Sequence, residues 1–467
     1  MINLTIKNKA RLLFTIALFF FASYILNINL GVSAFLLTLV VYLKLSSPNL
    51  KARHNLLYLA FLFVIIFVSS YFILRRGWPA AYIPFCVIPM LATLLFNELR
   101  ISLLITVAAA VAVASLAGNN FNLGLLFLTS GIISSALVFN VRRRMQIISA
   151  GFIVGLTQMV ILFFLDRFNL QNPTRYLTLM LSGLSSGVIV IGVLPVFEYL
   201  FKTVTNISLL ELADFNHPLL QRMITEAPGT YHHSLIVGNL SEAACNAVGA
   251  HALLARIGAY YHDIGKLQKP IYFSENQNIN ESQHDSLSPT MSKMVIMNHV
   301  RDGLELAKKY KLNPRLVDFI MQHHGKSLVY YFYRRALENI EEDQEIQEEG
   351  FRYPGPKPDS KETAIVLLAD SVEAACRALK DPTPPRIEGT VHKIINNKFI
   401  DGQLDECELT LKDLEKISAV FIHILSGIYH SRAIYPEEKK SENNHKKPTK
   451  EDSRNHLDGN LDKKSNS

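Results

Sequence analysis

Long apolar runs, separated by short polar breaks, fill the chain as far as Phe201. Most of them approach the about 20 residues that a membrane-spanning helix needs. The second run is short, so Leu12–Leu43 also reads as one overlong helix, which would give seven spans instead of eight. The pattern predicts a polytopic bundle of seven or eight membrane helices over residues 1–203. The eight runs are Leu12–Leu30, Gly31–Leu43, Leu56–Leu74, Ala80–Phe96, Ile101–Leu116, Phe121–Val141, Ile147–Leu165 and Leu177–Phe201.

Beyond Phe201 the apolar positions recur at helical spacing, and the alternation typical of strands is scarce. Residues 204–229 predict an amphipathic connector broken at Pro218, and residues 230–436 predict a cytosolic all-helical domain, so the fold class is all-α. In that domain Ser288 followed by Pro289 is typical of a helix start. Residues 437–467 are nearly all polar and predict a disordered tail. The expected domain helices are Ser234–Val248, Leu253–Lys266, Ser288–Tyr310, Pro314–His323, Lys361–Leu379 and Leu411–His430.

The chain is 49% hydrophobic and 19% charged, with a mean hydropathy of +0.19, which excludes an ordinary soluble enzyme and a disordered chain. Residues 1–203 contain 15 lysines and arginines but only three acids, Glu98, Asp166 and Glu198, which gives this part a net charge of +12. The remainder of the chain therefore has a net charge of −5. The overall charge of +7 therefore predicts no binding to a DNA or RNA duplex. The three acids lie near the ends of the runs, which disfavours a transporter, because ion paths need charges within the spans.

The basic residues of the membrane part indicate its orientation. With eight spans most of them fall on one side, which the positive-inside rule places in the cytoplasm. We therefore expect a multi-pass protein of the inner (plasma) membrane, in contact with the lipid bilayer, with both termini and the helical domain cytoplasmic. The outer loops are too short for a sizeable extracellular domain, and four cysteines without a CxxC pair predict no disulfide framework. The cytoplasmic basic residues are Lys7, Lys9, Arg11, Lys44, Lys51, Arg53, Arg100, Arg142, Arg143, Arg144 and Lys202.

Histidine recurs at intervals along the expected domain helices. Imidazole and carboxylate groups suit divalent metals such as iron, manganese, zinc or cobalt. A single helical histidine is weak evidence for a ligand, but the whole set supplies several imidazoles and two carboxylates. The segments are Tyr231-His232-His233-Ser234, His262-Asp263-Ile264-Gly265-Lys266, Asn298-His299-Val300, His323-His324-Gly325 and Leu368-Ala369-Asp370-Ser371.

The adjacent His262 and Asp263 are chemically useful together. Neighbouring side chains leave a helix about 100° apart, so both can reach a metal cluster placed between them. A carboxylate has two oxygens and can bridge two metals, and two metals about 4 Å apart can hold a hydroxide and clamp a phosphate for in-line displacement. Lys266, one turn along, would direct its ammonium group at a phosphate oxygen.

With these residues the soluble half resembles the HD (His-Asp) phosphohydrolase superfamily in its HDIG form, and within it the membrane-bound PgpH-type cyclic-di-AMP phosphodiesterases. The similarity covers about Leu209 to Pro436, and the preceding helices look like that family's seven-transmembrane-receptor region. Such proteins carry a large extracellular domain after their first helix, whereas here the first two apolar runs nearly abut. This departure concerns extracellular ligand sensing, not the hydrolase chemistry. The matching motifs are GTYHHSLIVGNLSE, GAYYHDIGKLQKP, FSENQ, MNHVRDG, QHHGKSLVYYFY, FRYPGPKP, LLADSVEAACRAL, DGQLDECELTL and GIYHSRAIYP.

The resemblance implies six ligands for two divalent transition metal ions, with Mn or Fe as the first candidates and Zn or Co as further ones. Apolar positions one turn along the helix favour His233 over His232 as a ligand, and His324 stays an alternative to His323. One metal would bind His233, His262, Asp263 and Asp370, and the other would bind Asp263, His299 and His323.

The resemblance also implies hydrolysis of cyclic-di-AMP to the linear dinucleotide pApA by a hydroxide held between the metals, with Asp263 and Lys266 as catalytic residues. Aromatic rings offer stacking faces to adenine, and basic side chains offer contacts to phosphate. On this basis the candidates for substrate binding are His324, Arg352, Tyr353 and Lys357.

Two other functions compete with this hypothesis. The first is hydrolysis of another nucleotide, cyclic-di-GMP or one like guanosine tetraphosphate. The Gly-Tyr-Pro tripeptide of the cyclic-di-GMP-cleaving HD group is absent from the sequence, which disfavours cyclic-di-GMP. The second is a membrane receptor whose domain binds a nucleotide without cleaving it, and the complete set of four histidines and two carboxylates argues against it. Assembly into a homo-oligomer stays open.

Overall fold

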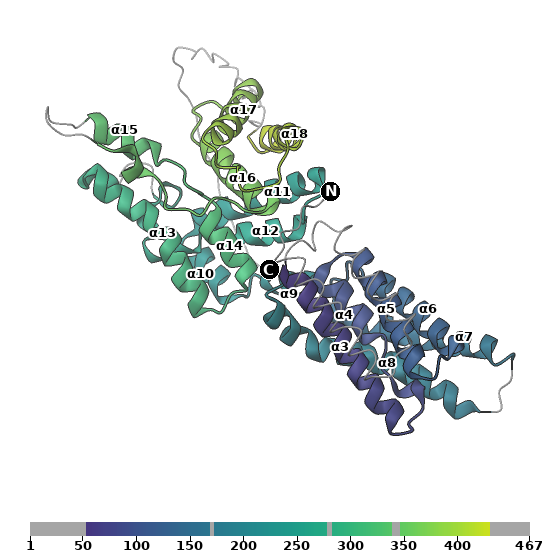
Figure 1. The fold of residues 1–467 in the computed structure, drawn as a ribbon. Coiled ribbons are helices and arrows are strands. Elements are labelled where there is room, and N and C mark those ends of the chain that lie inside the picture. The colour runs from purple at the N-terminus through teal and green to yellow at the C-terminus, as the bar shows by residue number, and fades with distance from the viewer. Residues whose placement is uncertain (1–52, 169–171, 278–282, 339–345, 430–467) are drawn as a thin grey trace, which may run out of the picture.

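The computed structural model describes residues 53–168, 172–277, 283–338 and 346–429 (Figure 1). Within these ranges the regular elements are helices, and the one strand-like pairing is an isolated bridge between Leu328 and Arg352. The predicted all-α class is confirmed, with an apolar bundle followed by a helical domain. The first two apolar runs and the polar tail lie outside the described residues, so the number of spans and the disorder of the tail stay predictions.

Five helices of the first half are long and apolar enough to cross a membrane. Two of them, α7 and α8, lie side by side, and their closest approach is at paired glycines. A Cβ atom on Gly183 would lie 2.3 Å from the backbone nitrogen of Gly155, so only glycine permits this contact. The five helices are α3 (Arg53–Arg75), α5 (Leu99–Leu116), α6 (Phe121–Val138), α7 (Arg144–Leu165) and α8 (Pro173–Phe201).

The structure differs from the prediction at Ala80–Phe96, which we expected to be one membrane span. The segment folds as a short 3-10 helix, η2 (Ala80–Tyr82), followed by α4 (Val87–Phe96). Pro84 lies between them and interrupts the helix because proline lacks an amide hydrogen and clashes with the preceding turn. At 1.5 Å per residue the 10 residues of α4 cover about 15 Å, half of the hydrocarbon core of a bilayer. All of them except Phe96 are buried, so α4 is a packed interior element.

The predicted connector consists of two short helices, α9 (Asn206–Leu212) and α10 (Pro218–Glu226), and the expected break before Pro218 is present. The imidazole of His217 caps α10 by accepting a hydrogen bond from the backbone of Leu219, at 3.4 Å. Apolar side chains of both helices share one core with the domain that follows. The members of this core include Leu209, Leu219, Leu220, Met223, Ile257, Tyr261, Ile264, Leu306 and Ile320.

Hydrogen bonds hold α9, the first helix of the connector, at both ends. Glu198, buried at the end of α8, accepts hydrogen bonds from the backbone of Thr205 at 2.9 Å and from the hydroxyl of Ser208 at 2.8 Å. At the other end the hydroxyl of the fully buried Tyr261 donates to the carbonyl oxygen of Leu212 at 2.6 Å. The connector is therefore part of the domain core and is tied to the last membrane helix.

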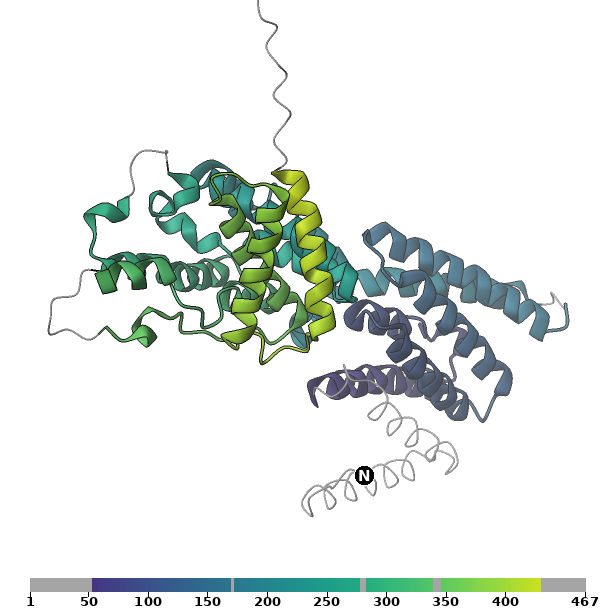
Figure 2. The same cartoon turned by 90° about the horizontal axis from the view of Figure 1, so that it is seen from above.

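The helical domain surrounds α16, in which every residue from Thr363 to Asp370 is buried. The predicted Ser288 cap is confirmed, since its side chain accepts from the backbone of Met291. Helices α15 and α17 were not predicted, and α17 lies along α18 on one side of the domain (Figure 2). The domain contains α11 (Pro228–Val248), α12 (Ala252–Tyr261), η3 (Ile264–Gln268), η4 (Pro270–Tyr272), η5 (Ser274–Asn276), η6 (Gln283–Ser286), α13 (Pro289–Lys309), α14 (Pro314–Gln322), α15 (Tyr330–Glu338), η7 (Glu348–Phe351), α16 (Lys361–Arg377), α17 (Pro384–Ile400) and α18 (Leu411–Ile428).

Candidate metal centre

The His-Asp pair lies where α12 changes into η3, and not inside one continuous helix as expected. His262 keeps helical backbone angles, whereas Asp263 leaves them and precedes the 3-10 turn. Gly265 explains the tight packing at this point. A Cβ atom there would lie 1.8 Å from the carbonyl oxygen of His299, so glycine allows α13 to bring that histidine against the pair.

Four buried side chains from α11, α16 and the α12–η3 junction form a first group of possible ligands, His233, His262, Asp263 and Asp370. One ligand atom from each lies within 4.8 Å of the others. Nε2 of His233 is 3.0 Å from Oδ1 of Asp370 and 3.7 Å from Oδ2 of Asp263. Nε2 of His262 is 3.2 Å from Oδ2 of Asp263. The four side chains therefore converge in the way that the ligands of one metal ion do.

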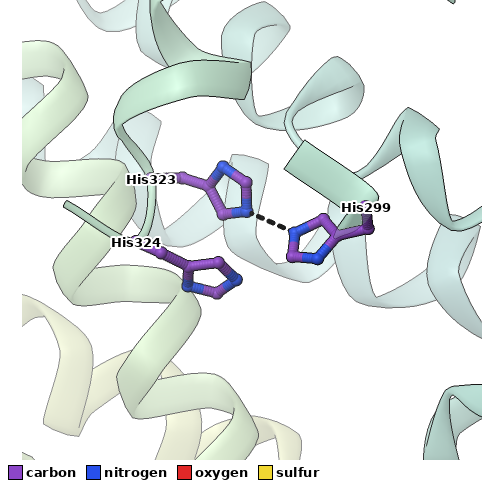
Figure 3. Close-up of side chains that lie close together, drawn as sticks. All are labelled: His299, His323 and His324. Atoms are coloured by element: carbon purple, nitrogen blue, oxygen red, sulfur yellow. Dashed lines mark hydrogen bonds between the residues drawn. The ribbon is translucent and has the colours of Figure 1, made fainter. Parts of the chain in front are cut away.

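A second group consists of His299, His323 and His324, again with ligand atoms within 4.8 Å of one another (Figure 3). The Nε2 atoms of His299 and His323 point toward each other at 3.1 Å. Oδ1 of Asp263 lies 3.4 Å and 3.6 Å from these two atoms, while its Oδ2 belongs to the first group. One carboxylate therefore stands between the two groups, each oxygen facing one of them.

The protonation of the histidines fits a metal site. The Nδ1 atoms of His262, His299 and His323 lie 2.6, 2.5 and 3.0 Å from the backbone carbonyl oxygens of Ala259, Ile296 and Ile320. A carbonyl oxygen only accepts, so each Nδ1 carries a proton, and Nε2 is the ring nitrogen that faces the centre and can bind a metal.

The centre also contains buried polar atoms without a hydrogen bond. Among the described residues, Nε2 of His262 and both oxygens of Asp263 make none, although Lys266 approaches Oδ2 as an ion pair. Buried groups are rarely left in this state, and divalent ions bind such nitrogen and oxygen donors. The residues therefore fit divalent metal ions.

Charge within the centre acts in the same direction. Burial raises the pKa of the Asp263 carboxyl, but the charges of His262 and Lys266 outweigh burial and hold that pKa well below its usual range. Burial lowers the pKa of His299 to about 4. The ionised carboxylate and the neutral imidazole are the forms that bind metals. Burial also lowers the pKa of His262, but Asp263 outweighs it and the pKa rises to about 10, so metal binding there displaces a proton.

The predicted catalytic Lys266 is buried between two carboxylates. Its Nζ lies 2.8 Å from Oδ2 of Asp263 and 2.6 Å from Oε1 of Glu275. Burial lowers the pKa of the ammonium group, but the two carboxylates outweigh burial and raise it above its ordinary value. Lys266 is therefore a fixed positive charge beside the carboxylate of Asp263, and its role toward phosphate stays a prediction.

The predicted substrate-binding residues divide into two pairs. His324 belongs to the second group of histidines, and the ring of Tyr353 stacks on it with centroids 4.3 Å apart. Arg352 pairs with Glu348 and Asp401 at 2.6 and 2.9 Å, and Lys357 pairs with Asp405 at 3.1 Å, so carboxylates already neutralise both cations. Of the adjacent histidines, His232 is exposed while His233 is buried in the centre, in agreement with the predicted helix face.

Glu373, which was not predicted, is buried on α16 one turn after Asp370. Its Oε2 lies 2.5 Å from Nδ1 of His233, in the place that backbone carbonyls take for the other histidines. The spacing of three residues from Asp370 on one helix was the signal that could have revealed it. Glu373 orients His233, as carboxylates behind metal-binding histidines do.

Comparisons with known proteins agree with this architecture. Residues 4–205 match the family described as 7TM receptor with intracellular HD hydrolase, and residues 230–375 match the HD domain. The predicted resemblance to the membrane-bound HD hydrolases is therefore confirmed, for the membrane part and for the helical domain.

Two relatives carry a more specific name. The cyclic-di-AMP phosphodiesterase PgpH of Bacillus subtilis (strain 168) is 42% identical over 426 residues, which are 87% of this chain and 59% of the relative. The protein of the same name from Listeria monocytogenes serotype 1/2a (strain 10403S) is 36% identical over 432 residues, or 88% of this chain and 59% of the relative. The chain thus spans 59% of the length of these relatives.

A solved structure of the HD domain of L. monocytogenes PgpH is 44% identical, covers 46% of this chain and 100% of its own, and has a TM-score of 0.44. A second structure of that domain, in complex with cyclic-di-AMP, has the same coverage and identity and a TM-score of 0.45.

Proposed function

We propose that the protein is a metal-dependent phosphodiesterase that hydrolyses cyclic-di-AMP to the linear dinucleotide pApA. The observation that carries the proposal is the position of Asp263, whose two oxygens face two separate groups of buried ligands. The names of the two PgpH relatives supply the substrate. Their identity with this chain extends over the domain that contains these ligands.

We assign His233, His262, Asp263 and Asp370 to one divalent transition metal ion, and Asp263, His299 and His323 to a second, with Mn or Fe as first candidates. Metal ions bound there would lower the pKa of a water molecule and polarise a phosphoryl oxygen. The contribution of the chain is electrostatic and positional. Asp263 and Asp370 remain ionised, and Lys266 holds a positive charge beside Asp263.

His324 and Tyr353 form a stacked pair beside the second group of ligands. Tyr353 is buried except for a 7% exposed fraction, and we propose that this pair orients the reacting end of the nucleotide. Arg352 and Lys357 would reach a phosphate only by leaving their carboxylate partners, so the structure gives them less support as contacts.

We further propose that the helical domain and both termini are cytoplasmic, and that the domains follow the predicted boundaries at 203, 229 and 436. Arg142, Arg143, Arg144 and Lys202 lie at the end of the bundle next to the connector, and Arg144 pairs with Glu211 of α9 at 2.7 Å. The positive-inside rule favours the cytoplasm for this end.

The test is a product assay on the purified full-length protein in detergent, with Mn, Fe, Zn and Co added separately. We expect cyclic-di-AMP to yield pApA, and cyclic-di-GMP and guanosine tetraphosphate to be poor substrates. The double variant His262→Ala/Asp263→Ala should lose turnover. Binding of cyclic-di-AMP without any product would refute hydrolysis and favour a receptor. Full activity of the double variant with its metal retained would refute the assignment of the site.

A further inference from the structure

Helix α17 brings one lysine, Lys398, next to the loop that carries His324. Nζ of Lys398 donates a hydrogen bond of 2.6 Å to the hydroxyl of Ser327. The backbone nitrogen of Ser327 donates to the carbonyl oxygen of His324 at 3.0 Å, and its carbonyl oxygen accepts from Tyr353, also at 3.0 Å. A single serine therefore connects the ammonium group of Lys398 to both members of the stacked pair beside the metal centre.

The charge of Lys398 sets it apart from the cations around it. Lys266, Arg352 and Lys357 all pair with carboxylates at 3.1 Å or less. Within the described part of the chain no carboxylate oxygen lies within 4.0 Å of Nζ of Lys398, whose hydrogen-bond partner is the neutral hydroxyl of Ser327.

The surroundings of Lys398 make this arrangement costly. Burial lowers the pKa of its ammonium group, against the opposing influence of Asp370 and Asp401. The half-buried Lys398 loses part of its hydration without gaining an acidic partner, and an anionic ligand would compensate for that loss.

The chemistry of a cyclic dinucleotide supplies such an anion. A cyclic dinucleotide has two phosphodiester groups, each with one negative charge, and the metal centre would bind the one that is cleaved. A lysine ammonium has three N–H donors, and Ser327 accepts from one, which leaves two for phosphoryl oxygens. Its hydrogen bond also fixes the direction of a long and otherwise mobile side chain.

We propose that Lys398 binds the phosphodiester of the cyclic dinucleotide that is not being cleaved. This inference rests on the proposed function and deepens it, because it explains how the site recognises a molecule with two phosphates. The contact persists unchanged from the bound substrate to the transition state, so it contributes to KM and not to kcat. Lys398 is accordingly a specificity residue that lies outside the bond-breaking chemistry.

The experiment compares the wild type with Lys398→Met in the full-length protein, using cyclic-di-AMP and the most active metal. We expect KM to rise at least about tenfold, the usual effect of removing a hydrogen bond to a charged group, with kcat within about twofold. Lys398→Arg keeps the charge and should retain KM within about threefold. Lys393→Met, on an exposed position of the same helix, is the matched control and should leave both constants unchanged.

Two results would overturn the inference while leaving the proposed function intact: an unchanged KM in Lys398→Met, or a fall in kcat at unchanged KM. If Lys398→Met loses bound metal or has a lower melting temperature, Lys398→Gln, which keeps a polar end, is measured in its place. The same rise in KM is expected for Lys398→Gln. Failure of the wild type to cleave cyclic-di-AMP would instead refute the proposed function itself.

Discussion

Replacing Glu373 tests whether the carboxylate behind His233 tunes the metal centre. Glu373 is buried, and its Oε2 accepts a hydrogen bond of 2.5 Å from Nδ1 of His233. In His262, His299 and His323 a backbone carbonyl oxygen accepts from Nδ1 instead of a side chain. Glu373→Gln keeps the shape and one acceptor oxygen but removes the charge. Glu373→Ala removes the hydrogen bond altogether and leaves Nδ1 of a buried ring without its partner.

The two variants should weaken metal binding to different extents. A hydrogen bond that involves a charged group contributes about 1.5–3 kcal/mol, which corresponds to a factor of about 10 to 150. Carboxylates behind metal-binding histidines typically change metal affinity or activity about 10- to 100-fold when they are lost. We expect Glu373→Gln to raise the half-saturating metal concentration about tenfold, and Glu373→Ala to raise it about a hundredfold. Activity at saturating metal should recover more fully in the glutamine variant.

The assay is turnover of cyclic-di-AMP titrated with metal after removal of bound ions, supported by metal content measured by elemental analysis. Glu388→Gln, at an exposed position on α17, is the control and should titrate like the wild type. If both Glu373 variants titrate like the wild type, the carboxylate does not act on metal binding through His233.

Two further predictions concern packing. Gly183→Ala places a Cβ atom 2.3 Å from the backbone nitrogen of Gly155 and should lower the stability of the membrane bundle by about 1–3 kcal/mol. Thermal unfolding in detergent measures this loss. The control is Gly192→Ala, whose Cβ atom meets no atom within 4 Å and which should leave the melting temperature unchanged. Tyr261→Phe removes the hydrogen bond to the carbonyl oxygen of Leu212 and should lower the free energy of unfolding by about 1 kcal/mol. Tyr331→Phe, on an exposed ring, is the control. Equal melting temperatures for the two variants would show that the Tyr261–Leu212 contact is not stabilising.

The length of an apolar run predicted most of the membrane helices but failed at Ala80–Phe96. Hydropathy averages over a window, whereas a single proline at position 84 decides whether the backbone continues as one helix. The burial of α4 on all sides depends on neighbours that come later in the chain. A local pattern therefore identifies apolar material without showing whether lipid or protein covers it.

The side chains that converge in the centre were predicted better than the groups that contact them. His233 could be chosen over His232 because helix geometry decides which of two neighbouring side chains faces the apolar side. Glu373 and Glu275 were missed because their partners, His233 and Lys266, become neighbours only when separate elements pack. Lys398 lies on a helix that was not predicted, and its importance depends on a missing acidic partner, which no sequence pattern displays.

The fixed connector has a consequence for communication between the two halves of the protein. Glu198 and Tyr261 tie α9 to α8 on one side and to the residue before His262 on the other, so no slack segment absorbs a displacement between them. A conformational equilibrium in the membrane would thus be coupled to the free energy of ion and nucleotide binding, and such coupling is reciprocal. Binding at the metal centre would then shift the equilibrium of the membrane helices by the same free energy with which that equilibrium would change binding at the centre.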